Sequence, residues 1–542
     1  MRQGAYLMDA TSQRSASDVT ARPEGKSRLP AWLSWALPAL AAATLGLYRV
    51  GGPMLWRDEL ATWSAASRTL PQLWTMVHHV DAVLGVYYFA LHLWMTMFGD
   101  SATAMRLPSV VAMTGAAAVV ALTGKRIGGP GAGLAGGLVF ALIPSVSRYA
   151  QEARPYALAA FFAALATLLL LRAVEHPRWH RWGGYALALA AAGAFNLVAL
   201  CVLAGHAVPV LTATRQRRPL APAILAGFCS SAIIAIAVDL PIVIEGHSQS
   251  LSQIGRQPTP TFAELTGLGG GLWPQLFSSS QVAVAILLLA VASAVAPRRV
   301  ASWYGLAFAT APIAAVWLVS QGPASYWVIR YLLFTVPAWA LAAGLGVAGL
   351  AERAGRLRLG RSGSARKLRY AVATGLVIAV GLLAVHDQWA IRQPEAHNFW
   401  AYPFVVANGE PVDYQGAAEV IAARERPGDG IVFQISDHNH YQVDTSVAYY
   451  LGGKPMPRPV FQAETPAQAG SLQPVECQQP ARCFAGTPRL WLVYVDHLVV
   501  GSSLNPFLAI PPDEAAVLHN AGYRISARYQ EDGISVVLMV SQ

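Results

Sequence analysis

The acidic pair Asp58-Glu59 follows the first long apolar segment, within the sequence Trp56-Arg57-Asp58-Glu59. A carboxylate pair beside a membrane segment is costly to keep there unless water, a cation or chemistry occupies the site. A carboxylate at this boundary can accept a proton from a hydroxyl nucleophile, as the transfer of a group to an alcohol requires. The alternative is helix capping, which an aspartate performs well. Position alone leaves both interpretations open.

A second polar cluster stands at the end of a later apolar segment and comprises Arg148, Tyr149, Gln151, Glu152, Arg154 and Tyr156; Arg330-Tyr331 begins another segment. Arginine presents a fork of donors that matches phosphate oxygens and stays charged where the dielectric constant is low. We expect Arg154 and Arg330 to bind an anion, because the loops on their side of the membrane carry few other basic residues. Arg148 and Arg106 are interpreted as structural, paired with a carboxylate or extended toward the headgroups.

His78, His79 and Asp81 stand within four residues of one another, before a short apolar segment. Side chains of these types could hold a metal or contact a phosphate, although no fourth ligand follows at metal-site spacing. A polar surface turn is the favoured interpretation of this group.

The composition indicates a helical membrane protein with many spans. The chain has 542 residues, of which 54% are hydrophobic, and a mean hydropathy of +0.40, which is too apolar for a soluble protein of this size. The formal net charge of +10 comes from basic clusters between apolar segments, where they indicate topology. Nucleic acid is therefore rejected as a partner.

About eleven apolar segments approach the length of roughly 20 residues that a span needs. They are Leu33 to Val50, Ala104 to Gly124, Gly131 to Val146, Pro155 to Arg172, Gly183 to Phe195, Leu197 to Leu211, Ala221 to Val243, Val282 to Ala296, Trp303 to Ser320, Val328 to Leu350 and Ala371 to Ala384. The segment 84–98 is shorter, so it is interpreted as an interfacial helix anchored by Tyr87, Tyr88 and Trp94, with a full crossing as the alternative.

Orientation follows from the basic clusters, which mark cytoplasmic loops. They place a disordered N-terminus, residues 1–30, in the cytoplasm and a membrane domain at 31–390 in the plasma membrane. The tail, residues 391–542, and the loops that carry Asp58, Glu152 and Arg330 then lie together on the external side.

The tail is expected to form a small α/β domain. Residues 416–426 and 513–520 have helical patterns, 431–435 and 490–495 are typical of buried strands, and 523–529 with 534–540 flank a hairpin signal at Glu531-Asp532-Gly533. An external location permits a disulfide between Cys477 and Cys483. The group Asp437, His438, His440 and Tyr441 is interpreted as an ordinary polar loop, with acceptor contact as the alternative.

Taken in order, these motifs resemble the GT-C membrane glycosyltransferases. The similar motifs are Trp56 to Glu59, Tyr87-Tyr88, Phe98 to Ser101 followed by Arg106 to Ser109, Gln151 to Tyr156, and Arg330-Tyr331 with Pro337. The likeness is to the branch that contains protein O-mannosyltransferase-like, aminoarabinose-transferase-like and Rhizobium lipopolysaccharide glycosyltransferase-like proteins. It covers about residues 33 to 350, and the tail is similar to the external domain of many bacterial members but less diagnostic.

The resemblance implies transfer of a sugar, with mannose one candidate, from a polyprenyl phosphate to a lipid, glycan or protein acceptor outside the cytoplasm, with inversion at the anomeric carbon. Asp58 matches the family's catalytic aspartate and would be the general base, while Glu59 would orient Asp58 or the acceptor. Arg154 and Arg330 would hold the donor phosphate. The other candidate substrate-binding residues are Tyr331, Glu152, Tyr156, Tyr87, Tyr88, His79 and Asp81.

The chain departs from the family before the Tyr87-Tyr88 helix. Relatives often carry a lysine or a proline-rich element there, whereas this chain has Val80-Asp81-Ala82-Val83-Leu84-Gly85. This difference leaves open whether the loop contacts a phosphate and which sugar donor is used. A need for Mg²⁺ or Mn²⁺ is also left open by the sequence.

Two other classes of function compete with the enzyme. A lipid or polysaccharide transporter would typically show inverted repeats and charges at mid-membrane depth, whereas no repeat is visible and the polar groups gather at segment ends. A non-catalytic protein could bind cell-wall glycan through the tail, although eleven spans exceed what an anchor needs.

Overall fold

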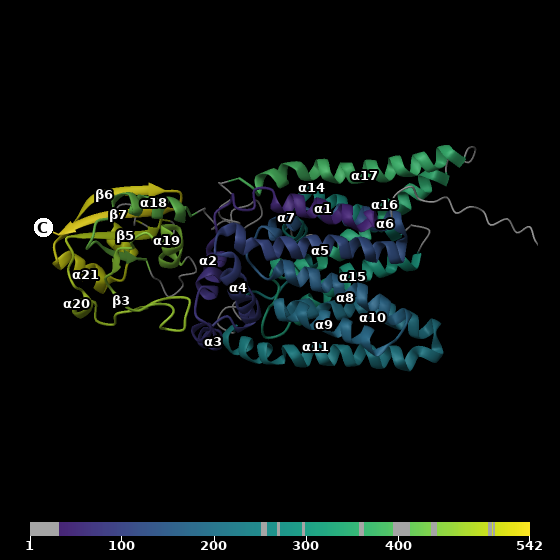
Figure 1. The fold of residues 1–542 in the computed structure, drawn as a ribbon, viewed down its shortest axis with the longest axis horizontal. Helices are drawn as coiled ribbons and strands as arrows, with labels where there is room; N and C mark the ends of the chain where they lie inside the picture. The colour runs from purple at the N-terminus through teal and green to yellow at the C-terminus, as the bar shows by residue number, and fades with distance from the viewer. Residues whose placement is uncertain are drawn as a thin grey trace, which may run out of the picture.

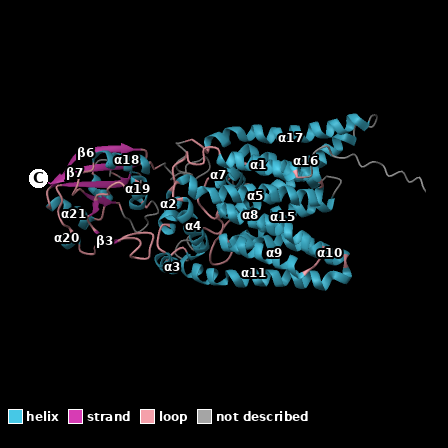
Figure 2. Ribbon diagram, viewed as in Figure 1, coloured by secondary structure: helices cyan, strands magenta, loops and turns pink. Residues whose placement is uncertain are grey.

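The computed structural model describes residues 32–250, 257–267, 271–294, 299–356, 362–393, 412–434, 442–496, 501 and 505–541. Long helices form a bundle at one end of the molecule, and a smaller part that contains strands forms the other end (Figures 1 and 2). The expectation of disorder at residues 1–30 and the polar group at 437–441 lie outside the described residues.

Every predicted apolar segment is helical where the structure describes it. The long helices are α1 (Leu33–Leu47), α5 (Ala102–Gly128), α6 (Pro130–Leu142), α8 (Tyr156–Glu175), α9 (Trp179–Phe195), α10 (Val202–Gln216), α11 (Ala221–Ser250), α14 (Ser280–Ala294), α15 (Arg299–Val319), α16 (Val336–Arg356) and α17 (Ser362–Ala390). Among the described residues, seven helices are long and apolar enough to cross a membrane, or eight if α6 and α7 (Pro144–Ala150), bent by 62°, form one span. The count of eleven crossings stays a prediction.

Small residues let the central helices approach closely. A Cβ atom added to Gly344 of α16 would lie 2.4 Å from the Cα of Gly136 in α6, and one added to Gly124 of α5 would lie 2.8 Å from the Cα of Gly133. Such backbone contacts are typical of membrane helices, which gain stability from van der Waals packing rather than from exclusion of water. The packing holds α5, α6 and α16 as a rigid base for the loops at their ends.

Four short elements lie between the bundle and the strand-containing part: α2 (Arg57–Ala66), α3 (Leu70–His79), the 3₁₀ turn η1 (Ala82–Leu84) and α4 (Gly85–Phe98). The segment interpreted as interfacial is α4 with η1, which falls among the apolar helices too short to pass as a span. Trp94 of α4 donates from its indole nitrogen to the carbonyl oxygen of Ala104, which joins α4 to the start of α5.

The C-terminal part contains a five-stranded mixed sheet in the order β2-β1-β5-β7-β6. Its central strand β5 (Arg489–Val495) pairs parallel with β1 (Gly430–Phe433) and antiparallel with β7 (Ile534–Ser541), and β7 continues to β6 (Tyr523–Glu531) in the predicted hairpin. Strand β2 (Arg458–Pro459) forms the other edge, and β3 (Gln462–Glu464) pairs with β4 (Val475–Glu476) in a separate two-stranded sheet. The strand and hairpin predictions for this part are therefore confirmed.

Helices complete the C-terminal part. They are α18 (Tyr414–Arg424), α19 (Val443–Leu451), the short α20 (Pro480–Cys483) and α21 (Pro512–Asn520). The two helices predicted at 416–426 and 513–520 correspond to α18 and α21, and Cys477 and Cys483 form a disulfide.

Candidate active site

The first turn of α2 brings the acidic pair to the junction between the two parts of the molecule. Trp56 precedes the helix in an extended conformation, and the carboxylate of Glu59 accepts the backbone N–H of Trp56 at 3.4 Å in a capping box. This contact stabilises the first turn of α2, in which Glu59 is the third residue. Asp58 lies in the same turn, at the positive end of the helix dipole.

Glu59 is held in a fully buried ion pair with Arg106 of α5. Arg106 Nε donates to Glu59 Oε1 at 2.9 Å and Arg106 Nη2 to Glu59 Oε2 at 2.7 Å, and both side chains are 0% exposed. The remaining donors of Arg106 reach the carbonyl oxygens of Val50, Pro53 and Met54 at 2.8 to 3.0 Å. The bidentate ion pair and the three carbonyl contacts together fasten the 50–59 loop to α5.

Asp58 is surrounded by three arginines at longer range. Its carboxylate lies 3.6 Å from Arg330 Nη1, 3.8 Å from Arg154 Nη2 and 3.7 Å from Arg57 Nε. The Asp58 side chain is 19% exposed and that of Arg330 is 25% exposed. Arg154 and Arg330, which were predicted to bind an anion, thus converge on Asp58 from distant parts of the chain. Asp58 and Arg330 are partly exposed, whereas the Arg154 side chain is only 8% exposed, and the role of these residues stays a prediction.

The turn at residues 151–155 carries Arg154 to this position. Gln151 Nε2 donates to the carbonyl oxygens of Gly46 and Tyr48 at 2.9 and 2.8 Å, and the backbone N–H of Ala153 donates to Glu59 Oε1 at 2.8 Å. Arg154 Nη1 then reaches the Asp58 carbonyl oxygen at 3.3 Å and Thr62 Oγ1 at 3.2 Å. The turn thus contacts both members of the acidic pair.

Glu152 points into the same buried region. It is 1% exposed, and its carboxylate oxygens accept no hydrogen bond from the described residues. Burial raises the pKa of Glu152 to about 7, against the attraction of nearby Arg148. Glu152 therefore changes its charge near neutral pH, beside a cluster of cations.

Aromatic rings border the two anion-binding candidates. The Arg154 guanidinium lies 5.9 Å from the Tyr156 ring centre, and the Arg330 guanidinium lies 5.8 Å from that of Tyr331 and 6.0 Å from that of Trp56. The Tyr156 and Tyr331 rings are 6.0 Å apart. The ring faces stabilise the two guanidinium groups without cancelling their charge, so both arginines can still attract an anionic ligand.

Of the remaining predicted residues, Asp81, Tyr87 and Tyr88 lie close enough to Arg154 to feel its charge, whereas His79 contacts the C-terminal part. Tyr88 donates from its hydroxyl to Asp81 at 2.9 Å, burial raises the pKa of Asp81, and Arg154 opposes this rise through its charge. Tyr87 is buried and its hydroxyl has no partner among the described residues. His79 lies apart, since its Nδ1 is 3.3 Å from the carbonyl oxygen of Gly470 in the C-terminal part.

The C-terminal part also reaches the loop before Asp58. The backbone N–H of Leu55 donates to the Tyr450 hydroxyl at 2.7 Å. Beside it, Tyr449 packs edge-on against Trp63 at 5.2 Å, and Trp63 Nε1 donates to Asp100 at 3.0 Å. The prediction that the tail and the acidic loop share one end of the molecule is confirmed, whereas the side of the membrane stays a prediction.

Sequence reasoning missed the contribution of Trp56 and Tyr450 and gave Arg106 no partner. Arg106 offered a signal, because a single arginine at the start of an apolar helix needs a counter-charge. Tyr450 offered none, since it lies 395 residues from its partner.

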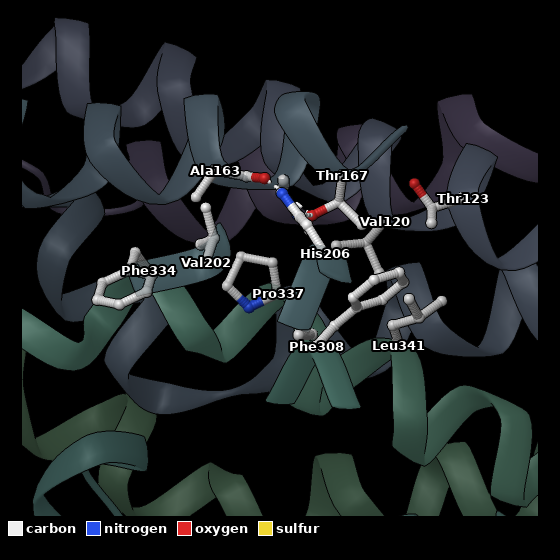
Figure 3. Close-up of a pocket in the computed structure, with 12 residues that line it drawn as sticks. Val120, Thr123, Ala163, Thr167, Val202, His206, Phe308, Phe334, Pro337 and Leu341 are labelled. Atoms are coloured by element: carbon white, nitrogen blue, oxygen red, sulfur yellow. Dashed lines mark hydrogen bonds between the residues drawn. The ribbon is translucent and has the colours of Figure 1, made fainter. Parts of the chain in front are cut away.

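A small cavity of about 20 Å³ lies within the bundle, away from these residues (Figure 3). His206 of α10 borders it, with Nε2 at 3.0 Å from Thr167 Oγ1 and Nδ1 at 3.0 Å from the Tyr185 hydroxyl. Its volume is about that of one water, and both imidazole nitrogens already have partners. The cavity therefore does not compete with Asp58 as a reaction site.

The structure joins a helical bundle to an α/β part, and a charged group lies where the two meet. Comparisons with known proteins confirm the resemblance to the GT-C membrane glycosyltransferases at the level of fold. Residues 85–243 match the sequence family described as dolichyl-phosphate-mannose-protein mannosyltransferase. A search of curated proteins finds no match.

Two solved structures support the same fold over nearly the whole chain. ArnT from Cupriavidus metallidurans bound to undecaprenyl phosphate has a TM-score of 0.55 and 13% identity, over 94% of this chain and 98% of that chain. The apo state of the same ArnT has a TM-score of 0.55 and 14% identity over the same shares. This likeness extends through the C-terminal part.

The acidic residues of the site do not form a metal-binding set. No group of three His, Cys, Asp or Glu side chains that could hold a metal occurs among the described residues. Glu59 is saturated by Arg106, and Asp58 faces three arginines. A requirement for Mg²⁺ or Mn²⁺ therefore stays a prediction, and the chemistry proposed below uses the side chains alone.

Proposed function

We propose that the protein is an inverting glycosyltransferase that moves a sugar from a polyprenyl phosphate to a hydroxyl group of a lipid, glycan or protein acceptor at the external face of the membrane. The observation that carries the proposal is Asp58, accessible and within 3.6 to 3.8 Å of two arginines from different helices. The fold of ArnT, solved with undecaprenyl phosphate, supports this class of donor.

Asp58 is the general base of the proposed reaction. Its carboxylate takes the proton of the acceptor hydroxyl while the acceptor oxygen forms a bond to the anomeric carbon of the sugar. The bond from that carbon to the phosphate oxygen breaks, and its electron pair leaves with the polyprenyl phosphate. Attack opposite the departing phosphate inverts the anomeric configuration.

Arg154 and Arg330 stabilise the departing phosphate. The donor is a phosphodiester, and the polyprenyl phosphate monoester that leaves gains a negative charge as the bond to the sugar breaks. Fixed guanidinium groups at the place where this charge develops lower the barrier. The aromatic faces and the small exposure of Arg154 strengthen this interaction by limiting access of water. Glu59 positions Asp58 through its capping contact and its bond with Arg106.

Mannose is the sugar to test first, because the family description that matches residues 85–243 names dolichyl-phosphate-mannose. Membranes that contain the chain should incorporate labelled mannose from a polyprenyl-phosphate donor. Asp58→Asn should reduce the rate by about 10²- to 10⁴-fold, the usual contribution of a general base.

Asp513→Asn, the same change at an exposed position of α21, is the matched control and should keep full activity. An Asp58→Asn variant that folds and retains most of its activity with every donor tested would contradict the proposal. Activity with another labelled sugar but not with mannose would change the donor and leave the mechanism standing.

A further inference from the structure

A basic hollow lies at the end of the bundle opposite the C-terminal part, where α5 and α8 end and α9 begins. Its volume is about 550 Å³, and it is bordered by Arg126, Arg172, Arg181, His176 and His180 together with Leu169 and Gly184. Three arginines from three helices surround one space. The proposed sugar transfer uses none of them.

The charges around the hollow are only partly neutralised. Arg126 forms a bidentate ion pair with Glu175, whose carbonyl oxygen also accepts a hydrogen bond from Arg217 at 2.7 Å. Arg181 Nη1 donates to the carbonyl oxygen of Arg172 at 3.0 Å, which carries no charge to compensate it. Within the described residues, the Arg172 guanidinium has no hydrogen bond or ion pair, so positive charge remains for an anion.

One side of the hollow is apolar, where Leu169 of α8 and Gly184 of α9 border it, and this side is called the apolar groove below. Leu165, Leu169, Arg172 and His176 follow one another at helical spacing on α8, so that face changes from apolar to basic toward its end. The matching face of α9 carries His180, Gly184 and Leu187. A Cβ atom added to Gly184 would find only Leu169 within 4 Å, at 3.9 Å, so this groove has room.

Exposed apolar side chains show what surrounds the groove. Leu187 is 75% exposed, and Trp179, at the first position of α9, is 86% exposed. Helix α9, with 17 residues, is not among the seven described helices that are long and apolar enough to cross a membrane alone. An exposed leucine on such a helix still suits contact with acyl chains, and a tryptophan at a helix end is typical of the headgroup level. The hollow therefore opens at the level where the headgroups of a lipid leaflet meet its acyl chains.

We propose that this hollow binds the phosphate headgroup of an anionic phospholipid of the adjacent leaflet, with an acyl chain along Leu169 and Leu187. Arg172 and Arg181 would contact the phosphate oxygens. Arg126, which is paired with Glu175, would add positive charge without contacting the phosphate. A basic pocket above an apolar groove matches the two halves of such a lipid and fits a soluble phosphate less well.

Native mass spectrometry of the full chain in detergent tests the site, with phosphatidylglycerol and phosphatidylcholine of identical acyl chains as probes. The wild type should retain phosphatidylglycerol preferentially. The double variant Arg172→Gln/Arg181→Gln should bind it about 30-fold more weakly, as expected for two basic residues at a membrane surface.

Arg215→Gln/Arg218→Gln removes two exposed arginines from the same end of the molecule but outside the hollow, and should keep the wild-type preference. Equal losses in both double variants would overturn the proposal, because general surface charge would then explain the binding. Displacement of the lipid by inorganic phosphate at equal concentration would also overturn it, since the ligand would then be a soluble anion.

A measurement on the unaltered chain guards against variants that fail to fold. Phosphatidylglycerol with a photoreactive acyl chain should cross-link to residues 165–187 on α8 and α9. Cross-links confined to other helices would overturn the proposal.

Discussion

Asp58 and Glu59 are neighbours in α2, yet each meets arginine in a different way. Glu59 is 0% exposed and bound by Arg106 through two short hydrogen bonds, whereas Asp58 is 19% exposed and lies 3.6 to 3.8 Å from its arginines. The first pair is closed to a ligand on all sides, whereas the second carboxylate shares three arginines at longer distances and is partly exposed. One carboxylate therefore holds the loop, and its neighbour is left available for chemistry.

The largest expected effect comes from breaking the buried pair. Arg106→Gln should lower the free energy of unfolding by about 3 to 5 kcal/mol, because it leaves the Glu59 carboxylate buried without a counter-charge. Thermal unfolding of the purified protein in detergent measures this loss. Asp58→Asn should leave the unfolding temperature nearly unchanged, because the Asp58 carboxylate of the wild type is partly exposed to water.

A double variant shows whether the loss comes from the uncompensated charge. Glu59→Gln/Arg106→Met should be more stable than the sum of the two single changes predicts, because it removes both charges together. Additive losses would mean that Arg106 acts mainly through its three carbonyl contacts rather than through Glu59.

The arginines around Asp58 should affect activity more than folding. Arg330→Gln should lower kcat/KM for the polyprenyl-phosphate donor by about 10- to 150-fold, the value of one or two hydrogen bonds to a charged group. Arg330→Lys should recover only part of this loss, because lysine keeps the charge but loses the fork.

Arg154→Gln should reduce kcat/KM similarly and also lower the unfolding temperature, since Arg154 contacts the Asp58 carbonyl oxygen and Thr62. Steady-state kinetics and unfolding measured on both variants separate the two roles. Unchanged donor kinetics in both would remove the phosphate-binding role from this pair.

Glu152 offers the smallest and most specific test, as a third carboxylate that is buried like Glu59 but lacks its clamp. Its pKa is raised from 4.5 to about 7, so the folded protein keeps a proton that the unfolded chain releases. This contribution to stability is complete below about pH 4.5 and is lost as the pH rises through 7. We expect a decrease in the free energy of unfolding on the order of 3 kcal/mol across that interval.

Glu152→Gln should remove this part of the pH dependence, which unfolding temperatures between pH 5 and 8 would reveal. Glu464→Gln, at an exposed position of β3, is the control and should leave the profile unchanged. An identical profile for Glu152→Gln and the wild type would show that Glu152 is already ionised at pH 5.

Local patterns predicted the elements well, because hydropathy and turn residues act over short distances. The hairpin around Gly533 and the buried strand at 490–495 are examples. The pairing of Glu59 with Arg106 was harder to predict, since partners 47 residues apart meet only after the helices pack. The contact of His79 with the carbonyl oxygen of Gly470 could not be predicted either, since it joins residues 391 positions apart, and the binding role of His79 stays a prediction.

The contact of the Leu55 amide with the Tyr450 hydroxyl has a consequence for biosynthesis. The acidic loop leaves the ribosome long before Tyr450, so during translation its amide has no such partner. The loop reaches its final shape only when the C-terminal part has folded and docked against it. A chain cut short after α17 would therefore carry the whole charged group around Asp58 yet lack this brace.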